Sequence, residues 1–123
     1  MKTIFAVDDS PTARASIEYT LSKGGFKVEL AEDGVIALDK INKYSEPIDV
    51  FLFDVNMPNM DGITLIKEVR KLPNFKFTPI LFLTTESQES KKMEGKNAGA
   101  SGWIVKPFEP DQLVSLMKRF TGE

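Results

Sequence analysis

The sequence contains neither cysteine nor histidine, and these two absences exclude most of the common catalytic and metal-binding arrangements. Without cysteine, the chain cannot form disulfides, thiolate zinc sites or iron–sulfur clusters. Without histidine, it cannot build a Ser-His-Asp or Cys-His catalytic site or carry a phosphohistidine. Any chemistry therefore depends on carboxylates, hydroxyls, lysines and a hard metal ion.

An excess of charge of one sign and long apolar runs are also missing. The 16 basic and 18 acidic residues give a net charge of −2, so the chain lacks the basic footprint of a nucleic-acid-binding protein. No stretch approaches the about 18 apolar residues that a membrane span needs. We therefore expect a cytoplasmic protein with no nucleic-acid or membrane partner, folded as one domain over residues 1–123.

Five short apolar runs are present, and they alternate with segments of helical spacing. Three of the runs are almost continuously apolar, which is typical of parallel strands buried on both faces. The second run alternates apolar and polar residues, which suits an edge strand. The pattern predicts an α/β fold with a doubly wound, five-stranded parallel sheet and five helices. The predicted strands are Thr3–Val7, Phe26–Leu30, Ile48–Phe53, Pro79–Leu83 and Trp103–Val105.

Capping and turn residues indicate where the helices begin and end. Ser10 and the proline after it open the first helix, and Gly24 and the glycine after it end that helix. The segment Ser87–Ala98 is polar and contains Gly95, which costs about 1 kcal/mol relative to alanine inside a helix. We therefore expect the fourth helix to be marginally stable and mobile.

Polar side chains come directly after four of the five predicted strands. Because the carboxyl ends of parallel strands share one edge, where ligands bind, these side chains are expected to meet. The strand order 2-1-3-4-5, one of two common orders, places the first and third strands side by side and gathers three carboxylates. Three neighbouring anions require a cation, and oxygen ligands favour Mg²⁺. The side chains are Asp8 and Asp9 after the first strand, Asp54 after the third, Thr84 after the fourth and Lys106 after the fifth.

Each of these residues taken alone is more typical of a helix cap, a strand end or a solvated surface, and only the joint arrangement indicates function. The pair Asp33-Gly34 also marks the start of the second helix. Both this pair and Asp61-Gly62 are interpreted as turns without chemistry.

The stretches AVDDSPTAR, AEDGVIAL, FDVNMPNMDGITLIKEVR, PILFLTTES and GASGWIVKPF resemble the receiver domain of two-component response regulators. Within that family they resemble the stand-alone, CheY-like chemotaxis regulators, in the same order and over nearly the whole chain. The resemblance implies a flavodoxin-like receiver fold without an output domain and Mg²⁺ as cofactor. It also implies a phosphoacceptor switch that dephosphorylates itself rather than an enzyme.

The resemblance assigns roles to individual residues around the predicted carboxylate cluster. It also implies that the Lys106–Pro107 bond is cis. The assignments are Asp54 as phosphoacceptor; Asp8, Asp9, Asp54 and the backbone carbonyl of Asn56 as metal ligands; Thr84 as switch hydroxyl; Lys106 as phosphate contact; Trp103 at the aromatic switch position; and Asn56 and Glu86 as residues that tune dephosphorylation.

The same resemblance implies the partners. Since the chain has no histidine, the phosphodonor is expected to be a separate, CheA-like histidine kinase or a small acyl phosphate. A target protein, with a flagellar motor switch as one candidate, is expected on the face formed by the fourth helix, fifth strand and fifth helix. The protein is expected to be a monomer.

Two other functions remain open at this stage. An aspartyl-phosphate phosphatase of the haloacid dehalogenase type would carry its D-x-D motif after the first strand, whereas here the acceptor candidate Asp54 comes after the third strand. A receiver-like adaptor that is not phosphorylated would not need the intact acidic pocket.

Overall fold

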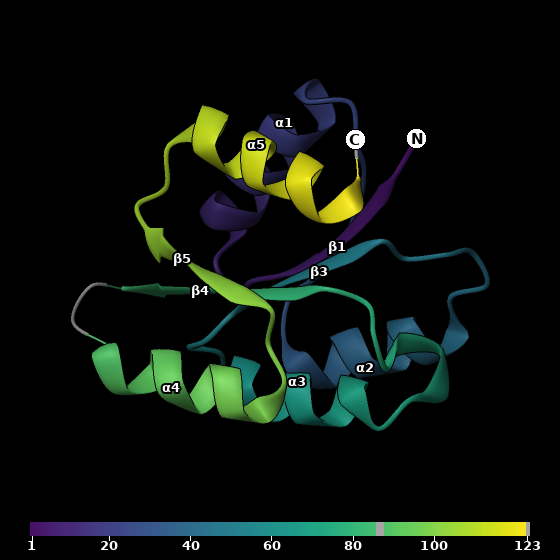
Figure 1. Cartoon of the computed structure of the whole chain (residues 1–123), viewed down its shortest axis with the longest axis vertical. Coiled ribbons are helices and arrows are strands. Elements are labelled where there is room, and N and C mark those ends of the chain that lie inside the picture. Colours follow the sequence, from purple (N-terminus) through teal and green to yellow (C-terminus); the bar gives the residue numbers. More distant parts are fainter. Residues whose placement is uncertain (86–87, 123) are drawn as a thin grey trace.

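A five-stranded parallel sheet forms the centre of the computed structural model, which describes residues 1–85 and 88–122. The strand order is β2-β1-β3-β4-β5 (Figure 1), so the predicted fold class and the order 2-1-3-4-5 are confirmed. The edge position predicted for the second strand is also correct, and four of its five residues are only partly buried. The strands are β1 (Thr3–Val7), β2 (Lys27–Ala31), β3 (Val50–Asp54), β4 (Ile80–Thr85) and β5 (Gly102–Lys106).

Three strands extend past their predicted apolar runs into polar residues, and β2 also ends one residue later than predicted, at Ala31. Asp54 ends β3, Thr84 and Thr85 end β4, and Lys106 ends β5. Apolar patterning reflects the side chains, whereas strand pairing joins backbones, and the ladder continues past the last apolar residue. In the ladder between β4 and β5, Thr85 lies opposite Lys106. The polar residues are therefore held by the sheet itself.

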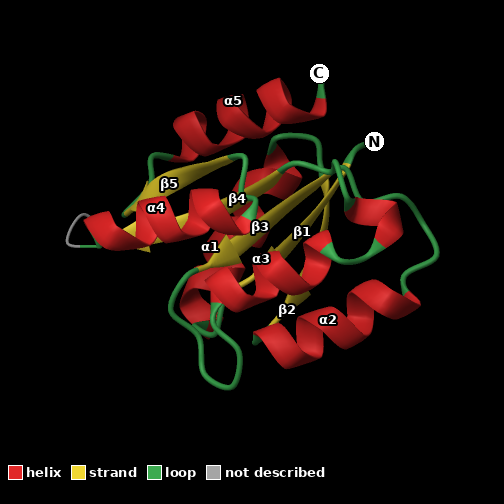
Figure 2. Ribbon diagram, turned by 60° about the horizontal axis from the view of Figure 1, so that its bottom comes forward, coloured by secondary structure: helices red, strands yellow, loops and turns green. Residues whose placement is uncertain are grey.

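Helices cover both faces of the sheet (Figure 1). Helices α1 and α5 lie on one face, and α2, α3 and α4 lie on the other, with α3 between its two neighbours (Figure 2). Among the described residues, no helix is long and apolar enough to cross a membrane. The helices are α1 (Pro11–Lys23), α2 (Gly34–Lys43), α3 (Gly62–Arg70), α4 (Glu89–Ala98) and α5 (Pro110–Thr121), with a short 3₁₀ helix η1 (Pro73–Phe75) after α3.

Two apolar cores result, one on each face of the sheet, because successive strand residues point to opposite sides. Leu52 and Leu81 belong to the core beneath α1 and α5, whereas Phe51, Phe53 and Phe82 belong to the core beneath α2 and α3. This double burial explains why the strand sequences are almost continuously apolar.

Side-chain caps begin the first three helices. The hydroxyl of Ser10 accepts a hydrogen bond from the Ala13 N–H at 3.2 Å, as the sequence predicted. Asp33 and Asp61 cap α2 and α3 by accepting backbone N–H groups of the first turn at 2.9 and 2.8 Å. The predicted start of the second helix at Asp33-Gly34 is therefore confirmed, and Asp61-Gly62, which was interpreted only as a turn, is also a helix start.

Arg70, at the end of α3, joins the segment between α3 and β4 to the loop after α4. Its guanidinium donates to the backbone carbonyls of Gly99, Phe75 and Thr78 at 3.0, 2.8 and 2.6 Å. The first of these carbonyls lies just after α4, the second belongs to the last residue of η1, and the third lies between η1 and β4. This side chain fixes the end of α4 against the rest of the molecule.

Gly95 is the residue through which α4 packs on the sheet. It is the buried residue of that helix and lies against the ring of the fully buried Phe82. A Cβ atom at this position would collide with the ring. The residue that lowers the intrinsic stability of α4 is therefore also the residue that allows the helix to approach β4.

Replacing Gly95 with alanine is expected to destabilise the protein, although helix propensity alone would favour alanine by about 1 kcal/mol. Forcing an extra carbon against a packed ring costs about 1–3 kcal/mol, so the free energy of unfolding in urea should fall. The exposed Asn97 in the same helix provides the matched control, and Asn97→Ala should leave stability unchanged or raise it. A Gly95→Ala protein as stable as the wild type would show that α4 packs differently.

Candidate functional site

Three carboxylates meet at the carboxyl edge of the sheet. Asp8 and Asp9 come directly after β1, and Asp54 ends the neighbouring strand β3. One oxygen from each carboxylate lies within 4.8 Å of the other two. Asp8 is 1% exposed and Asp54 is 6% exposed, whereas Asp9 is open to solvent. The expectation that strand order would gather these three residues is confirmed.

Lys106, from the end of β5, contacts two of these carboxylates. Its Nζ lies 2.9 Å from Asp8 Oδ2 and 3.2 Å from Asp54 Oδ1. Burial by itself lowers the pKa of Lys106, but the hydrogen bond to Asp8 and the negative charge of Asp54 outweigh it and raise the pKa. The ammonium group therefore stays charged. The Lys106–Pro107 bond is cis, as expected.

The pKa of Asp54 is raised from 3.8 to about 6. Burial is the main cause, and the negative charge of Asp8 adds to it, while the positive charge of Lys106 acts in the opposite direction. The carboxylate is therefore ionised at neutral pH, at an energetic cost that a nearby cation would remove.

The donor set of this cluster fits a hard divalent cation. Asp8, Asp9 and Asp54 provide three negative charges, against one positive charge from Lys106. The side chain of Arg14 donates to the backbone carbonyl of Asp8 at 2.7 Å. Oxygen-only coordination with one or two carboxylates is the arrangement in which proteins bind Mg²⁺.

Thr84 lies beside this cluster on β4 and is 1% exposed. Its hydroxyl donates toward the side-chain oxygen of Gln88 at 3.1 Å, with the Thr85 carbonyl as a second acceptor at 3.3 Å. The predicted switch hydroxyl is therefore buried next to the carboxylates and already hydrogen-bonded.

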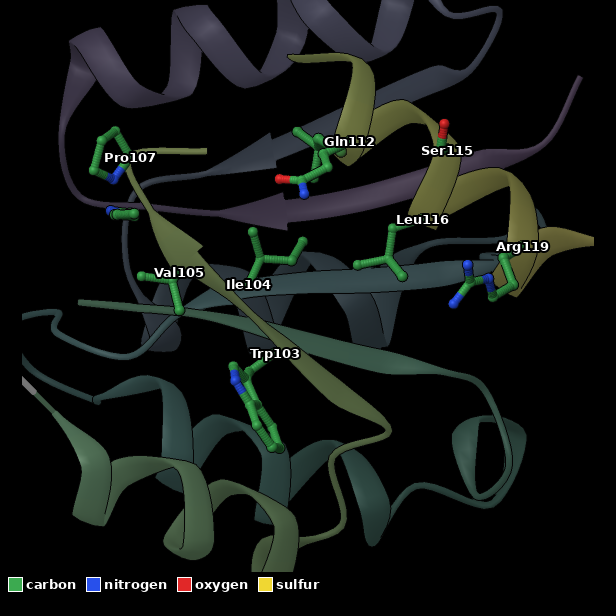
Figure 3. A pocket seen from close by; sticks show the side chains of 10 residues that line it. Trp103, Ile104, Val105, Pro107, Gln112, Ser115, Leu116 and Arg119 are labelled. Atoms are coloured by element: carbon green, nitrogen blue, oxygen red, sulfur yellow. The ribbon is translucent and has the colours of Figure 1, made fainter. Parts of the chain in front are cut away.

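Trp103 lies on β5 with its indole directed outward, toward α4, and 42% exposed (Figure 3). The ring packs beside Phe82, with centroids 6.3 Å apart, and the Lys92 ammonium lies 5.7 Å from the indole centroid. This tryptophan is therefore not part of either apolar core.

Asn56 and Glu86 were both predicted to tune dephosphorylation. Asn56 lies two residues after Asp54, and its exposed side chain accepts a hydrogen bond from Gln88 at 3.0 Å. Its backbone carbonyl as a metal ligand stays a prediction. Glu86 lies outside the described residues.

Gln88 is the residue of this region that the sequence did not reveal. It contacts Thr84, Thr85 and Asn56 through both ends of its side-chain amide. A glutamine just before a helix is an ordinary residue, and no motif or spacing distinguishes it.

Comparison with known proteins agrees with this geometry. The response regulator receiver domain model matches residues 4–118. The chain is 40% identical to the chemotaxis protein CheY1 of Helicobacter pylori, over 97% of this chain and 96% of that protein. Other curated relatives are longer, and the chain spans about half of their length.

Solved structures show the same likeness. The Vibrio cholerae chemotaxis protein CheY4 superposes with a TM-score of 0.90 at 48% identity, with 98% of each chain covered. The receiver domain of the Pseudomonas aeruginosa sensor histidine kinase PA1611 has a TM-score of 0.89 at 28% identity, covers 99% of this chain and 98% of its own, and holds a magnesium ion in its active site cleft. With the family match over most of its length and these relatives at 40% and 48% identity, the chain belongs to the response regulator receiver domain family.

Proposed function

We propose that this receiver is a CheY-like phosphoacceptor switch in a two-component chemotaxis phosphorelay. It would act in the cytoplasm as a monomer and accept its phosphoryl group on Asp54. The observation that carries the proposal is the Asp54 carboxylate, gathered with Asp8 and Asp9 and paired with Lys106. Because the chain has no histidine, the donor is a phosphohistidine on a separate, CheA-like kinase or a small acyl phosphate.

In the transfer step, a carboxylate oxygen of Asp54 attacks phosphorus while the bond to the donor nitrogen or oxygen breaks. Phosphoryl transfer has a loose transition state and needs mainly in-line positioning and charge neutralisation. Lys106, 3.2 Å from Asp54 Oδ1, neutralises charge on the incoming phosphoryl oxygens. Asp8, Asp9, Asp54 and the Asn56 carbonyl would hold Mg²⁺, which supplies further charge neutralisation when bound.

Hydrolysis of the acyl phosphate returns the protein to its resting state. Water attacks phosphorus, the bond to Asp54 breaks, and inorganic phosphate leaves. Asn56, two residues beyond the acceptor, and Glu86 are the side chains proposed to control access of this water and so the lifetime of the signal.

The output would be a change of the face formed by α4, β5 and α5. A phosphoryl group that draws the Thr84 hydroxyl toward it leaves space behind that side chain, which the outward Trp103 can fill. On the α5 side of β5, an open groove of about 670 Å³ includes Ile104, Leu116 and Arg119 in its lining (Figure 3). A target such as a flagellar motor switch protein would bind this face.

Incubation with acetyl phosphate and Mg²⁺ should place one phosphoryl group on the wild-type protein, and Asp54→Asn should abolish this labelling. The amide has the shape of the carboxylate but is not a nucleophile of comparable strength. Intact-protein mass spectrometry under mild conditions measures the added mass, with the exposed Asp39 as control in Asp39→Asn. Undiminished labelling of Asp54→Asn would exclude the assignment, and turnover of a sugar phosphate would favour the phosphatase alternative.

The raised pKa of Asp54 predicts a pH-dependent stability in the metal-free protein. The folded state binds the proton of the Asp54 carboxyl more tightly than the unfolded chain does. The stabilisation of the folded state by this proton is therefore fully present below pH 3.8 and is lost as pH rises through about 6. Asp54→Asn, which is never charged, should therefore raise the free energy of unfolding at pH 7.5 by at most about 3 kcal/mol. The gain should disappear near pH 4 in chelator-containing urea titrations, and a gain independent of pH would contradict this account.

Trp103, the only tryptophan of the chain, provides a test of the switch. Its emission should change when acetyl phosphate and Mg²⁺ are added together, and much less with Mg²⁺ alone. Thr84→Val keeps the buried side chain's shape but removes the hydroxyl, so it should blunt the change while Asp54 is still labelled. Equal emission changes in wild type and Thr84→Val would show that the signal reaches Trp103 by another route.

A further inference from the structure

The side-chain amide of Gln88 joins the switch strand to the loop after the acceptor aspartate. Its Oε1 accepts from the Thr84 hydroxyl at 3.1 Å, and its Nε2 donates to Asn56 Oδ1 at 3.0 Å. Thr85 adds two further donors to the same Oε1, its backbone N–H at 3.0 Å and its hydroxyl at 3.1 Å. Gln88 itself is half-buried and directly precedes α4.

The chemistry of these partners fixes which way the amide faces. Both hydroxyls and the backbone N–H of Thr85 can donate to the amide oxygen, and Asn56 Oδ1 can only accept. Turning the amide over would place its N–H₂ group against the Thr85 N–H, which has no acceptor to offer. The oxygen of Gln88 therefore points at Thr84.

The hydroxyl of Thr84 has a single proton, and in the resting structure Gln88 receives it. The proposed switch requires the same proton for a phosphoryl oxygen. We propose that Gln88 is a positioning residue, a latch that competes with the phosphoryl group for the Thr84 hydroxyl and so stabilises the resting conformation. This inference rests on the proposed function and adds to it a residue that sets the threshold of switching.

The nitrogen end of the Gln88 amide holds the side chain of Asn56. While Gln88 Nε2 holds Asn56 Oδ1, the side chain two residues beyond Asp54 is tied to the start of α4. Breaking the bond to Thr84 removes one of the three donors that hold the amide oxygen, which weakens the hold of the amide on Asn56.

The start of α4 is suited to such a release. Gln88 occupies the N-cap position, but its side chain makes no capping hydrogen bond with the helix, because the amide is used by Thr84, Thr85 and Asn56. Its backbone carbonyl accepts the Lys91 N–H at 3.0 Å. A movement of the Gln88 side chain can therefore shift the first turn of α4 through the backbone of the same residue.

The strength of one neutral hydrogen bond sets the expected size of the effect, which is about a two- to tenfold change in an equilibrium. The Thr85 carbonyl, 3.3 Å from the Thr84 hydroxyl, stays available as a weaker acceptor when Gln88 is removed. The latch therefore shifts the balance between the two conformations and does not abolish either of them.

The test compares Gln88→Met, which has a similar length but no amide, with the wild type. The acetyl phosphate concentration that half-saturates Asp54 labelling should fall two- to tenfold, and Trp103 emission should already lie closer to that of the phosphorylated protein before donor is added. Gln88→Glu, which keeps the acceptor oxygen for Thr84, should need at least as much donor as the wild type. Ser90→Ala, in the first turn of α4, is the matched control and should behave as the wild type.

A second background shows whether Gln88 acts through Thr84. In the Thr84→Val background, Gln88→Met should leave the half-saturating acetyl phosphate concentration unchanged, because the hydroxyl proton for which Gln88 competes is gone. If Gln88→Met lowered this concentration by the same factor in both backgrounds, or did not lower it in the wild-type background, the proposal would be overturned.

A nuclear magnetic resonance measurement separates failure of the latch from failure of the proposed function. The side-chain N–H₂ signals of Gln88 in the unphosphorylated protein should be shifted from those of a free amide and should move toward them in Asn56→Ala and Thr84→Val. If the wild type does not label at Asp54, the proposed function fails, and these signals still decide whether the amide is held. Signals at the free-amide position in the wild type would overturn the latch even if labelling succeeds.

Discussion

The mutual repulsion of Asp8, Asp9 and Asp54 is the interaction on which the other features of the molecule depend. Parallel pairing of β1 with β3 brings two of these carboxylates together in a buried position, where an unpaired charge is costly. Burial, with the negative charge of Asp8 as the second cause, raises the pKa of Asp54, and the positive charge of the inward Lys106 acts against this rise. We propose that this surplus of negative charge attracts a metal ion, and that the ion and the lysine together neutralise an incoming phosphoryl group.

The strands β4 and β5, which carry Thr84 and Lys106, also carry Trp103, the residue expected to respond to phosphorylation of the site. Thr84 lies opposite Val105 in the ladder between β4 and β5, and Phe82 lies opposite Trp103. The site and the outward indole are thus a few residues apart on paired strands. Helix α4 packs on this region through Gly95, and Gln88 directly precedes its first residue, Glu89.

The sequence predicted the sheet and the polar residues at its carboxyl edge because these depend on strand periodicity and on the residue that ends each strand. The strand order is not encoded in that periodicity, and it was chosen as one of two common orders of such sheets. The ends of β3, β4 and β5 were misplaced, since Asp54, Thr84 and Lys106 are polar residues in a backbone ladder. The role of Gly95 depends on the distance between α4 and Phe82, which no periodicity encodes. The contacts of Gln88 and Arg70 join segments far apart in the chain, so only the folded structure reveals them.

Thermal unfolding with and without Mg²⁺ tests the central claim most directly. A cation that binds the folded protein but not the unfolded chain raises the midpoint by mass action. At pH 7.5, millimolar Mg²⁺ should raise the midpoint of the wild type above that in sodium chloride of equal ionic strength. Asp9→Asn, which removes the exposed member of the cluster, should lose most of this increase. An equal increase in both proteins, or none in the wild type, would contradict the account.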